Sequence, residues 1–414
     1  MKKVFCIAII QLLLCNSVVF ATNYYVSTNG NNKNSGLSLS QSWATLGCAL
    51  VSSLAASRGY QPGDTLFVAP GTYSEYLDLG HLSNIVVIAY DMNNRPIIKP
   101  INSPTHVVRI TNQSHNAAFI GFVIDGSSSP LPVICGIKVT GQNVHDIWIA
   151  DCEIKNCMAS GVMLSDLANH ITFDHLVVHD NGDGKDVGKH GFYIVAPYVT
   201  VQYCTVYHHA GDGIKIGTDD CKNESNFDTI RDNICYSNSY HNTSPRSGIL
   251  VSSTDTGTMV YNNISYDNND GIIIELHANN VKVYNNTCYN NKANGIYVHL
   301  DPCSLNPKEL LASEHVSIKN NLLYKNNSNR IFGVPLNGFS IDSLSAKTID
   351  TGNNWLNNGD PKLVNPDAGD FHVAAHSPLI DAGEKLKGVN TDFDKKRRPK
   401  SRKYTIGAFE GPEE

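Results

Sequence analysis

A single lysine interrupts the apolar stretch GDGIKIGTDD at residues 211–220, where Lys215 stands between two isoleucines. A deprotonated lysine amine can act as a base, and apolar flanks with nearby cations favour the neutral amine. Arg246 could neutralise a carboxylate, so that negative charge can develop there when the adjacent carbon loses its proton. His190 or Tyr193 could pass a proton to a leaving oxygen. Together these four residues could catalyse a β-elimination on a carboxylated sugar, provided that the fold brings them together.

Further polar residues are expected to bind substrate on the same surface. They are Lys189, Asp212, Glu275, His277 and His299. Asp212 and Glu275 are also the carboxylate pair that a glycoside hydrolase would need on this surface.

A calcium site is a second possibility for this region. The loop HDNGDGKDVGK at 179–189 is rich in Asp, Asn and Gly, although it lacks the twelve-residue, helix-flanked calcium pattern. The acids that could ligate the ion are Asp183, Asp186, Asp219 and Asp220. A calcium ion there could replace a basic side chain in neutralising a substrate carboxylate.

The chain repeats itself at intervals of 22 to 35 residues. One series consists of short apolar strands that begin with glycine: GIKVT (136–140), GVMLS (161–165), GFYIV (191–195), GIKIG (213–217), GILVS (248–252), GIIIE (271–275) and GIYVH (295–299). A second series, with the pattern NNxxxY, alternates with the first. Short strands separated by Asn, Asp and Gly turns at this period predict a solenoid, and each unit is too short for a four-stranded propeller blade. We therefore expect an all-β, right-handed parallel β-helix.

Coil stacking decides whether the candidate residues meet. In each glycine-led strand the second and fourth residues are apolar and should face the core, while the third and fifth face outward. Coils in register would place Tyr193 beside Lys215, about 4.8 Å apart. His190, Asp212 and Arg246 stand just before successive strands, so they should gather on the same groove. The asparagine pairs, such as Asn262-Asn263, are expected to form a hydrogen-bonded ladder along the stack.

Both ends of a solenoid need covers, because their strand edges would otherwise be unpaired. The segment 39–58 predicts an amphipathic helix with Trp43, Leu46, Ala49, Leu50 and Leu54 on one face, which would cap the N-terminal end. The expected organisation is a signal peptide (1–21), an N-terminal cap with the first coil (22–75), the β-helix (76–350) and an irregular C-terminal cap (351–414). Within the last segment, the charged cluster at 394–398 is expected to be a solvated turn.

Bulk properties narrow the functional class. The chain has 414 residues and a formal net charge of −6, which argues against a generally basic nucleic-acid binder. The start has two lysines, an apolar run and a small residue at Ala21, so we expect a secretory signal cleaved near Ala21, export from the cytoplasm and no membrane span. We expect a monomer whose partner is an acidic polysaccharide. Four cysteines in strand-like runs are expected to be core residues: Cys152, Cys204, Cys235 and Cys288.

These segments resemble a known superfamily. YYVSTNGNNKNSG, PGDTLFVAPGTYSE and the two repeat series are similar to the right-handed parallel β-helix superfamily of exported bacterial proteins, which includes pectate and alginate lyases, hydrolases and epimerases. The end, from GDPKLVNPDAGDFHVAAHSPLIDAG onward, resembles a C-terminal segment common in those proteins. The resemblance covers essentially the whole mature chain and implies the fold, but it leaves several activities open.

Family motifs discriminate among these activities. The polygalacturonase-like hydrolase pattern fails, because Lys189-His190-Gly191 comes before Asp219-Asp220 and no RIK follows; the DPHD of alginate epimerases is also missing. The aspartates around Lys215 loosely resemble calcium-dependent pectate lyases. Lys215 with Arg246 resembles the lysine–arginine pair of chondroitinase- and alginate-lyase-like enzymes. The resemblance thus favours a polysaccharide lyase; the alternatives are a glycoside hydrolase or a non-catalytic carbohydrate-binding solenoid.

Overall fold

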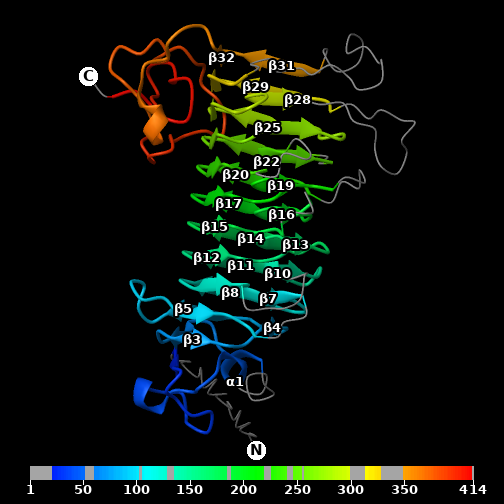
Figure 1. The fold of residues 1–414 in the computed structure, drawn as a ribbon, viewed down its shortest axis with the longest axis vertical. Coiled ribbons are helices and arrows are strands. Elements are labelled where there is room, and N and C mark those ends of the chain that lie inside the picture. The colour runs from blue at the N-terminus through cyan, green and yellow to red at the C-terminus, as the bar shows by residue number, and fades with distance from the viewer. Residues whose placement is uncertain are drawn as a thin grey trace, which may run out of the picture.

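The computed structural model describes residues 21–51, 60–101, 105–127, 135–183, 188–218, 225–239, 246–253, 256–298, 313–327 and 348–412. The chain winds into a long right-handed coil whose strands stack into three parallel sheets, with the N-terminal end at the bottom of Figure 1. This confirms the predicted parallel β-helix. None of the described helices is long and apolar enough to cross a membrane.

Each described coil contributes one strand to each sheet in the order A, B, C along most of the chain. In hydrogen-bonded order, sheet A contains β1 (Asn23–Val26), β2 (Asp64–Val68), β5 (Ile85–Ala89), β8 (His115–Ile120), β11 (His145–Ala150), β14 (Asn169–Asp174), β17 (Thr200–Gln202), β20 (Thr229–Arg231), β23 (Met259–Tyr261), β26 (Lys282–Tyr284), β29 (Val316–Lys319) and β31 (Ile349–Gly352). Sheet B contains β3 (Thr72–Tyr73), β6 (Ile97–Ile98), β9 (Val123–Asp125), β12 (Glu153–Lys155), β15 (Val177–His179), β18 (Thr205–Tyr207), β21 (Ile234–Tyr236), β24 (Ile264–Tyr266), β27 (Thr287–Tyr289), β30 (Leu322–Tyr324) and β32 (Trp355–Leu356). Sheet C contains β4 (Leu77–Leu79), β7 (His106–Ile110), β10 (Cys135–Thr140), β13 (Val162–Ser165), β16 (Phe192–Ile194), β19 (Ile214–Ile216), β22 (Ser247–Ser252), β25 (Asp270–Glu275) and β28 (Ile296–Val298).

The core runs along the axis of the coil and is built by alternation. In β19, Ile214 and Ile216 are fully buried and belong to one core cluster that extends from Val26 to Leu323. Branched side chains suit this surface because they pack against the same position of the coils above and below. The four cysteines expected in the core are all buried there as free thiols, which confirms that prediction.

Buried asparagines form two ladders at the corners between sheets, and the first contains the asparagine pairs that the sequence predicts to stack. In the ladder between sheets A and B, the Asn233 backbone N–H and Nδ2 both donate to Oδ1 of Asn263 at 3.0 Å, and Asn263 repeats this on Asn286. A second ladder, between sheets B and C, joins Asn238, Asn268, Asn291 and Asn326. Each amide also donates to a backbone carbonyl, so these polar groups are satisfied without water.

A histidine takes the place of asparagine in the second ladder. Nδ1 of the buried His209 accepts the N–H of Asn181 at 3.3 Å, and Nε2–H donates to the carbonyl of Val178 at 3.1 Å. Both contacts require a neutral ring with its proton on Nε2. Burial lowers the pKa of His209 to about 3.

Replacing His209 with asparagine should therefore protect the fold against acid. Because the folded pKa lies below the unfolded value of about 6.5, the neutral ring stabilises the fold fully above that pH, and this contribution is lost as the pH falls toward 3. At pH 4 the loss is about 3 kcal/mol, at ~1.4 kcal/mol per pKa unit. The new asparagine side chain can repeat the contacts of Asn238, so His209→Asn should change the free energy of unfolding little at pH 7 and raise it at pH 4. Urea unfolding at both pH values measures this, and the exposed His208→Asn variant is the control; an equal effect at both pH values would contradict it.

The N-terminal end differs from the sequence prediction, and the predicted α-helical cap is wrong. Among the described residues of 39–58, only a 3-10 turn η1 (Leu39–Gln41) and one short helix α1 (Leu46–Leu50) are helical; Leu54 lies outside the described residues. Trp43 is buried as predicted, but its backbone pairs with Val26 in an extended conformation, and the helix starts only at the Thr45 cap. The apolar spacing thus reflects packing against the first coil. Residues 1–20 of the predicted signal peptide (1–21) also lie outside the described residues.

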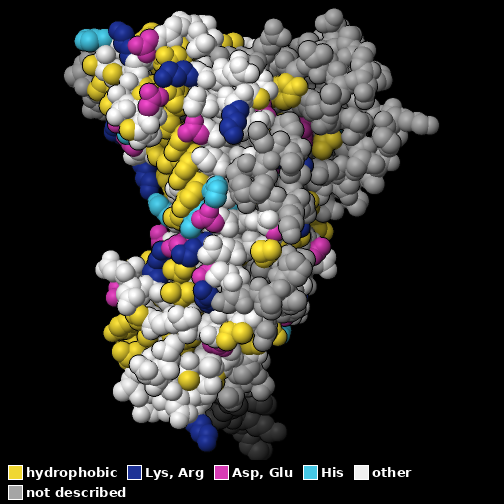
Figure 2. Space-filling model, in the orientation of Figure 1, with side chains coloured by type: hydrophobic (Ala, Val, Ile, Leu, Met, Phe, Trp, Pro, Cys, Tyr) yellow, Lys and Arg dark blue, Asp and Glu magenta, His cyan; other side chains and the backbone are white. Residues whose placement is uncertain are grey.

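The C-terminal segment folds back along the outer face of sheet B. It carries β33 (Leu363–Asn365), the 3-10 turn η2 (Pro366–Ala368) and β34 (Asp370–Val373), and it lies at the upper left of Figure 1. Phe371 and Phe409 pack with Tyr289 and Leu322 of the coil in a second apolar cluster. Figure 2 shows hydrophobic side chains beside this segment and charged side chains of both signs below it.

Candidate active site

The outward residues of sheet C form the register that the sequence predicts. Tyr193 in β16 pairs with Lys215 in β19, which pairs with Leu250 in β22. Nζ of Lys215 lies 5.6 Å from the centre of the Tyr193 ring, within the range of a cation–π contact. The His190 and Tyr193 rings are 5.4 Å apart, centre to centre.

Polar residues converge where the chain enters these strands. Nδ1 of His190 lies 3.0 Å from the backbone nitrogen of Asp212 and 3.2 Å from its Oδ2. Nη1 of Arg246 lies 3.9 Å from the same Oδ2. On its other side, Oδ1 of Asp212 accepts the backbone N–H of Ser247 at 2.6 Å and its hydroxyl at 3.0 Å. The structure therefore brings His190, Tyr193, Asp212, Lys215 and Arg246 together over adjacent coils.

Asp212 is the electrostatic centre of this cluster. Burial by itself raises the pKa of its carboxyl group, but the adjacent His190 and the cations of Arg246 and Lys215 outweigh burial and lower it to about 2. Burial lowers the pKa of His190. A neutral His190 accepts the Asp212 N–H through Nδ1, so Oδ2 has no hydrogen-bond partner among the described residues. The site thus holds an ionised carboxylate facing a guanidinium at a distance too long for a hydrogen bond.

The surface over the cluster is not the open groove that the sequence predicts. Lys215, Leu250 and Ile273 face outward, yet only 2%, 1% and 6% of their surface is exposed. Tyr193 keeps part of its surface accessible on the neighbouring coil, and so does Arg246. Asp212 is fully buried, so it lies beneath Arg246 and cannot contact a polymer directly.

The remaining predicted residues are spread more widely. Lys189 lies on the same turn, where its backbone carbonyl accepts the Gly211 N–H at 2.7 Å. Glu275 ends β25 and pairs with Ser252, and His277 follows it, where its Nε2 accepts from the side-chain amide of Asn279 at 3.0 Å. Both therefore lie at the opposite end of the strands from Asp212. His299 lies outside the described residues.

This placement does not support the carboxylate pair of a glycoside hydrolase. Asp212 aligns with Ser247 at the start of β22, and Glu275 aligns with Ser252 at its end. Five residues of strand correspond to about 16 Å. The carboxylates of glycosidases lie ~5–9.5 Å apart.

A polar row beneath the site is absent from the sequence prediction. Ser160 accepts the His190 N–H at 3.1 Å, Ser247 holds Asp212, and Asp270 accepts the N–H and amide of Asn294. All stand immediately before the glycine of a repeat: Ser160, His190, Asp212, Ser247, Asp270 and Asn294. This recurrence is visible in the sequence and could have identified Ser247 as the residue that anchors Asp212.

The described part of the site does not fit a calcium ion. Its carboxylate, Asp212, is already faced by His190, Arg246 and Ser247, and the other charged groups are cationic, whereas calcium requires several oxygen ligands. Asp186, Asp219 and Asp220, which the sequence suggests as ligands, lie outside the described residues. Within the described ranges no three His, Cys, Asp or Glu side chains are grouped to hold a metal.

Comparisons with known proteins agree with this architecture. The family described as "Right handed beta helix region" matches residues 106–264 and 229–375. Pectate lyase Pel9A superposes with a TM-score of 0.59 at 16% identity, covering 96% of this chain and 98% of that one. A rhamnogalacturonan lyase gives a TM-score of 0.56 at 14% identity (83% and 91% coverage), and the Azotobacter vinelandii mannuronan C-5 epimerase AlgE4 A-module gives 0.51 at 15% (73% and 85%). A search of curated proteins finds no match. At these identities the solved structures establish the fold and not the reaction. Because the family match spans more than half of its residues, the chain belongs to the right-handed β-helix family.

Proposed function

We propose that this chain is an exported polysaccharide lyase that cleaves a uronate-containing polymer by β-elimination. The observation that carries the proposal is the convergence of Lys215, Tyr193 and Arg246 around one buried carboxylate on the outer face of sheet C. The fold is shared with lyases and epimerases that act on such polymers, according to their names. In an acidic chain, a local cationic cluster suits an acidic ligand.

The reaction divides among three side chains. Arg246 pairs with the uronate carboxylate, so that negative charge can build up on it as the adjacent carbon loses its proton. The Lys215 ammonium of the resting site must first lose its proton. The resulting amine then takes the proton of that carbon, the electron pair forms the new carbon–carbon double bond, and the bond to the glycosidic oxygen breaks. The phenol of Tyr193 donates a proton to the leaving oxygen. Tyr193 suits this step better than His190, which is buried and whose Nδ1 is engaged by the Asp212 N–H. Only 2% of the Lys215 surface is exposed, so the mechanism requires that this side chain become accessible when the polymer binds.

An assay on a panel of polymers tests the reaction class. Purified protein is incubated with pectate, alginate and glycosaminoglycans, and the ultraviolet absorbance of unsaturated uronate is followed together with new reducing ends. The proposal expects both signals to rise together on at least one polymer. Reducing ends without the absorbance would indicate a hydrolase, and binding without either signal would indicate a non-catalytic solenoid.

Replacing Asp212 with asparagine should weaken substrate binding while the fold survives. The amide oxygen of the new side chain can still accept from Ser247, but Arg246 loses the charge that holds it 3.9 Å away. We expect kcat/KM to fall about 10- to 100-fold, as for a lost charged contact of ~1.5–3 kcal/mol, mainly through a higher KM. Steady-state kinetics on the cleaved polymer measure this. Asp270→Asn is the control, because it alters the same position of a different coil; equal losses in the two variants would mean that Asp212 acts only in folding.

A further inference from the structure

A hollow of about 720 Å³ lies at the corner between sheets B and C, on the sheet B side of the candidate active site. We call it the corner groove, and the residues of its lining that matter here are Ser237, Asp267, Asn290, Lys292, Lys325 and Asn327. Its volume is within the range of ligand sites, about 300–1,000 Å³.

The corner groove follows from the way each coil turns. Ser237, Asp267, Asn290 and Lys325 each follow a sheet B strand and have a positive φ, between 50° and 56°, which turns the chain at the same point of successive coils. The buried ladder amides Asn238 and Asn291 lie next to them in the chain and form the floor. One polar side chain is therefore presented per coil, at intervals of about 4.8 Å along the axis.

Several of these side chains keep hydrogen-bonding capacity for a ligand. Within the described ranges, the Lys292 ammonium, the Ser237 hydroxyl and the Asn327 amide have no hydrogen-bond or ion-pair partner. Asn290 donates to Asp267 at 2.6 Å, which fixes both side chains and leaves the Asn290 carbonyl available. Lys325 donates to the Tyr289 hydroxyl at 2.9 Å and lies 3.5 Å from Oδ1 of Asp367, so it is held in place at the edge of the groove.

We propose that the corner groove binds a stretch of carboxylated polysaccharide lying along the axis of the coil. Its polar lining suits a ligand rich in hydroxyl groups, and the absence of a Phe, Tyr or Trp from that described lining argues against a stacked base or an apolar ligand. Coil spacing is close to the length of one pyranose unit in an extended chain, so successive sugars can meet equivalent positions. The Lys292 ammonium supplies positive charge that complements a carboxylate in a chain whose net charge is −6, while Asp267 is engaged by Asn290 and Lys325 is shared with Asp367. This site is separate from the catalytic residues and does not depend on turnover.

Binding of defined oligosaccharides tests the proposal. Lys215→Ala serves as the host, so that no probe is consumed, and isothermal titration calorimetry is run with hexamers of galacturonate, mannuronate and neutral glucose. We expect at least one acidic hexamer to bind, with affinity falling as salt rises, and the neutral hexamer to bind at least about tenfold more weakly. No acidic hexamer binding, or equal binding of the neutral one, would overturn the proposal.

A charge reversal locates the binding. Lys292→Glu in the same host should weaken the acidic hexamer about tenfold or more, the loss expected for one charge-assisted contact turned repulsive. Lys282→Glu, which reverses an exposed charge on sheet A, is the matched control. Equal affinities for the two variants would overturn the corner groove as the site. Because binding is read without turnover, a chain that cleaves no polymer could still pass this test, and a functional lyase could fail it.

Discussion

Replacing Lys215 with alanine is expected to reduce uronate elimination about 10²- to 10⁴-fold, the contribution of a positioned general base. Lys215 is paired in register with Tyr193, beside the carboxylate that faces Arg246. The loss should appear mainly in kcat, because the base acts when the proton leaves rather than when the polymer binds. Initial rates of the absorbance of unsaturated uronate measure it on the polymer that the wild-type chain cleaves.

Two further variants distinguish chemistry from folding. Lys215→Met keeps the aliphatic part of a nearly buried side chain and should be as inactive as alanine while unfolding at the same urea concentration as wild type. Lys138→Ala removes an outward lysine from the equivalent position of β10, three coils away on the same ladder, and should retain activity. Full activity in either Lys215 variant would remove the base from the mechanism.

The register could be predicted because the coil has few degrees of freedom. A slip of one residue in β19 would expose Ile214 and Ile216 and bury Lys215 in the core, so the glycine-led repeat fixes which residue stacks on Tyr193. The asparagine ladder follows in the same way, since the second residue of each Asn pair returns at the same corner. Local alternation thus determines both the core and the rows of side chains outside it.

Other features depend on contacts that the repeat does not encode. Strand alternation predicts that Lys215 faces outward, but it does not specify how much of that outer surface is exposed. The apolar spacing at 39–58 fits a helix equally well, but the backbone pairing of Trp43 with Val26 favours an extended chain there. Asp212 was expected at the surface, yet the recurring polar residue before each glycine belongs to a buried row. In each case the tertiary structure overrides what the local sequence pattern predicts.

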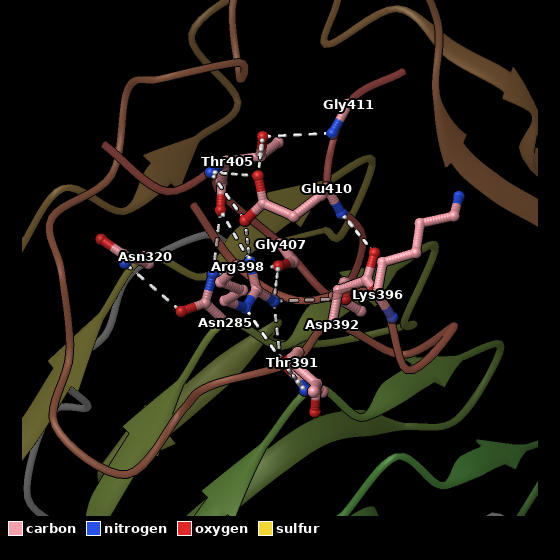
Figure 3. A network of polar contacts seen from close by, with 12 residues as sticks. Asn285, Asn320, Thr391, Asp392, Lys396, Arg398, Thr405, Gly407, Glu410 and Gly411 are labelled. Carbon is pink, nitrogen blue, oxygen red and sulfur yellow. Dashed lines mark hydrogen bonds and ion pairs between the residues drawn. The ribbon is translucent and has the colours of Figure 1, made fainter. Parts of the chain in front are cut away.

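Replacing Arg398 with alanine should destabilise the chain by about 3–5 kcal/mol, as expected when one partner of a buried ion pair is removed. The sequence suggests a solvated turn at 394–398, and Arg397 is indeed exposed, but the Arg398 side chain is fully buried. Figure 3 shows Arg398 at the centre of a polar network that includes Glu410. Its Nη1 donates to Glu410 at 2.6 Å, and its Nη2 donates to Asn262 at 2.8 Å. Asn262 belongs to the coil, so this contact fastens the C-terminal segment to it. Urea unfolding followed by tryptophan fluorescence and circular dichroism measures the effect.

The neighbouring arginine and a double variant test the cause. Arg397→Ala removes an exposed charge from the same turn and should change the unfolding free energy by less than about 0.5 kcal/mol. Arg398→Met with Glu410→Leu removes both charges, so it should be more stable than the sum of the single losses implies, because neither charge is left buried alone. Strictly additive losses would show that the ion pair does not hold the segment. Apolar contacts such as Phe371 with Tyr266 and Tyr289 would then provide the attachment to sheet B.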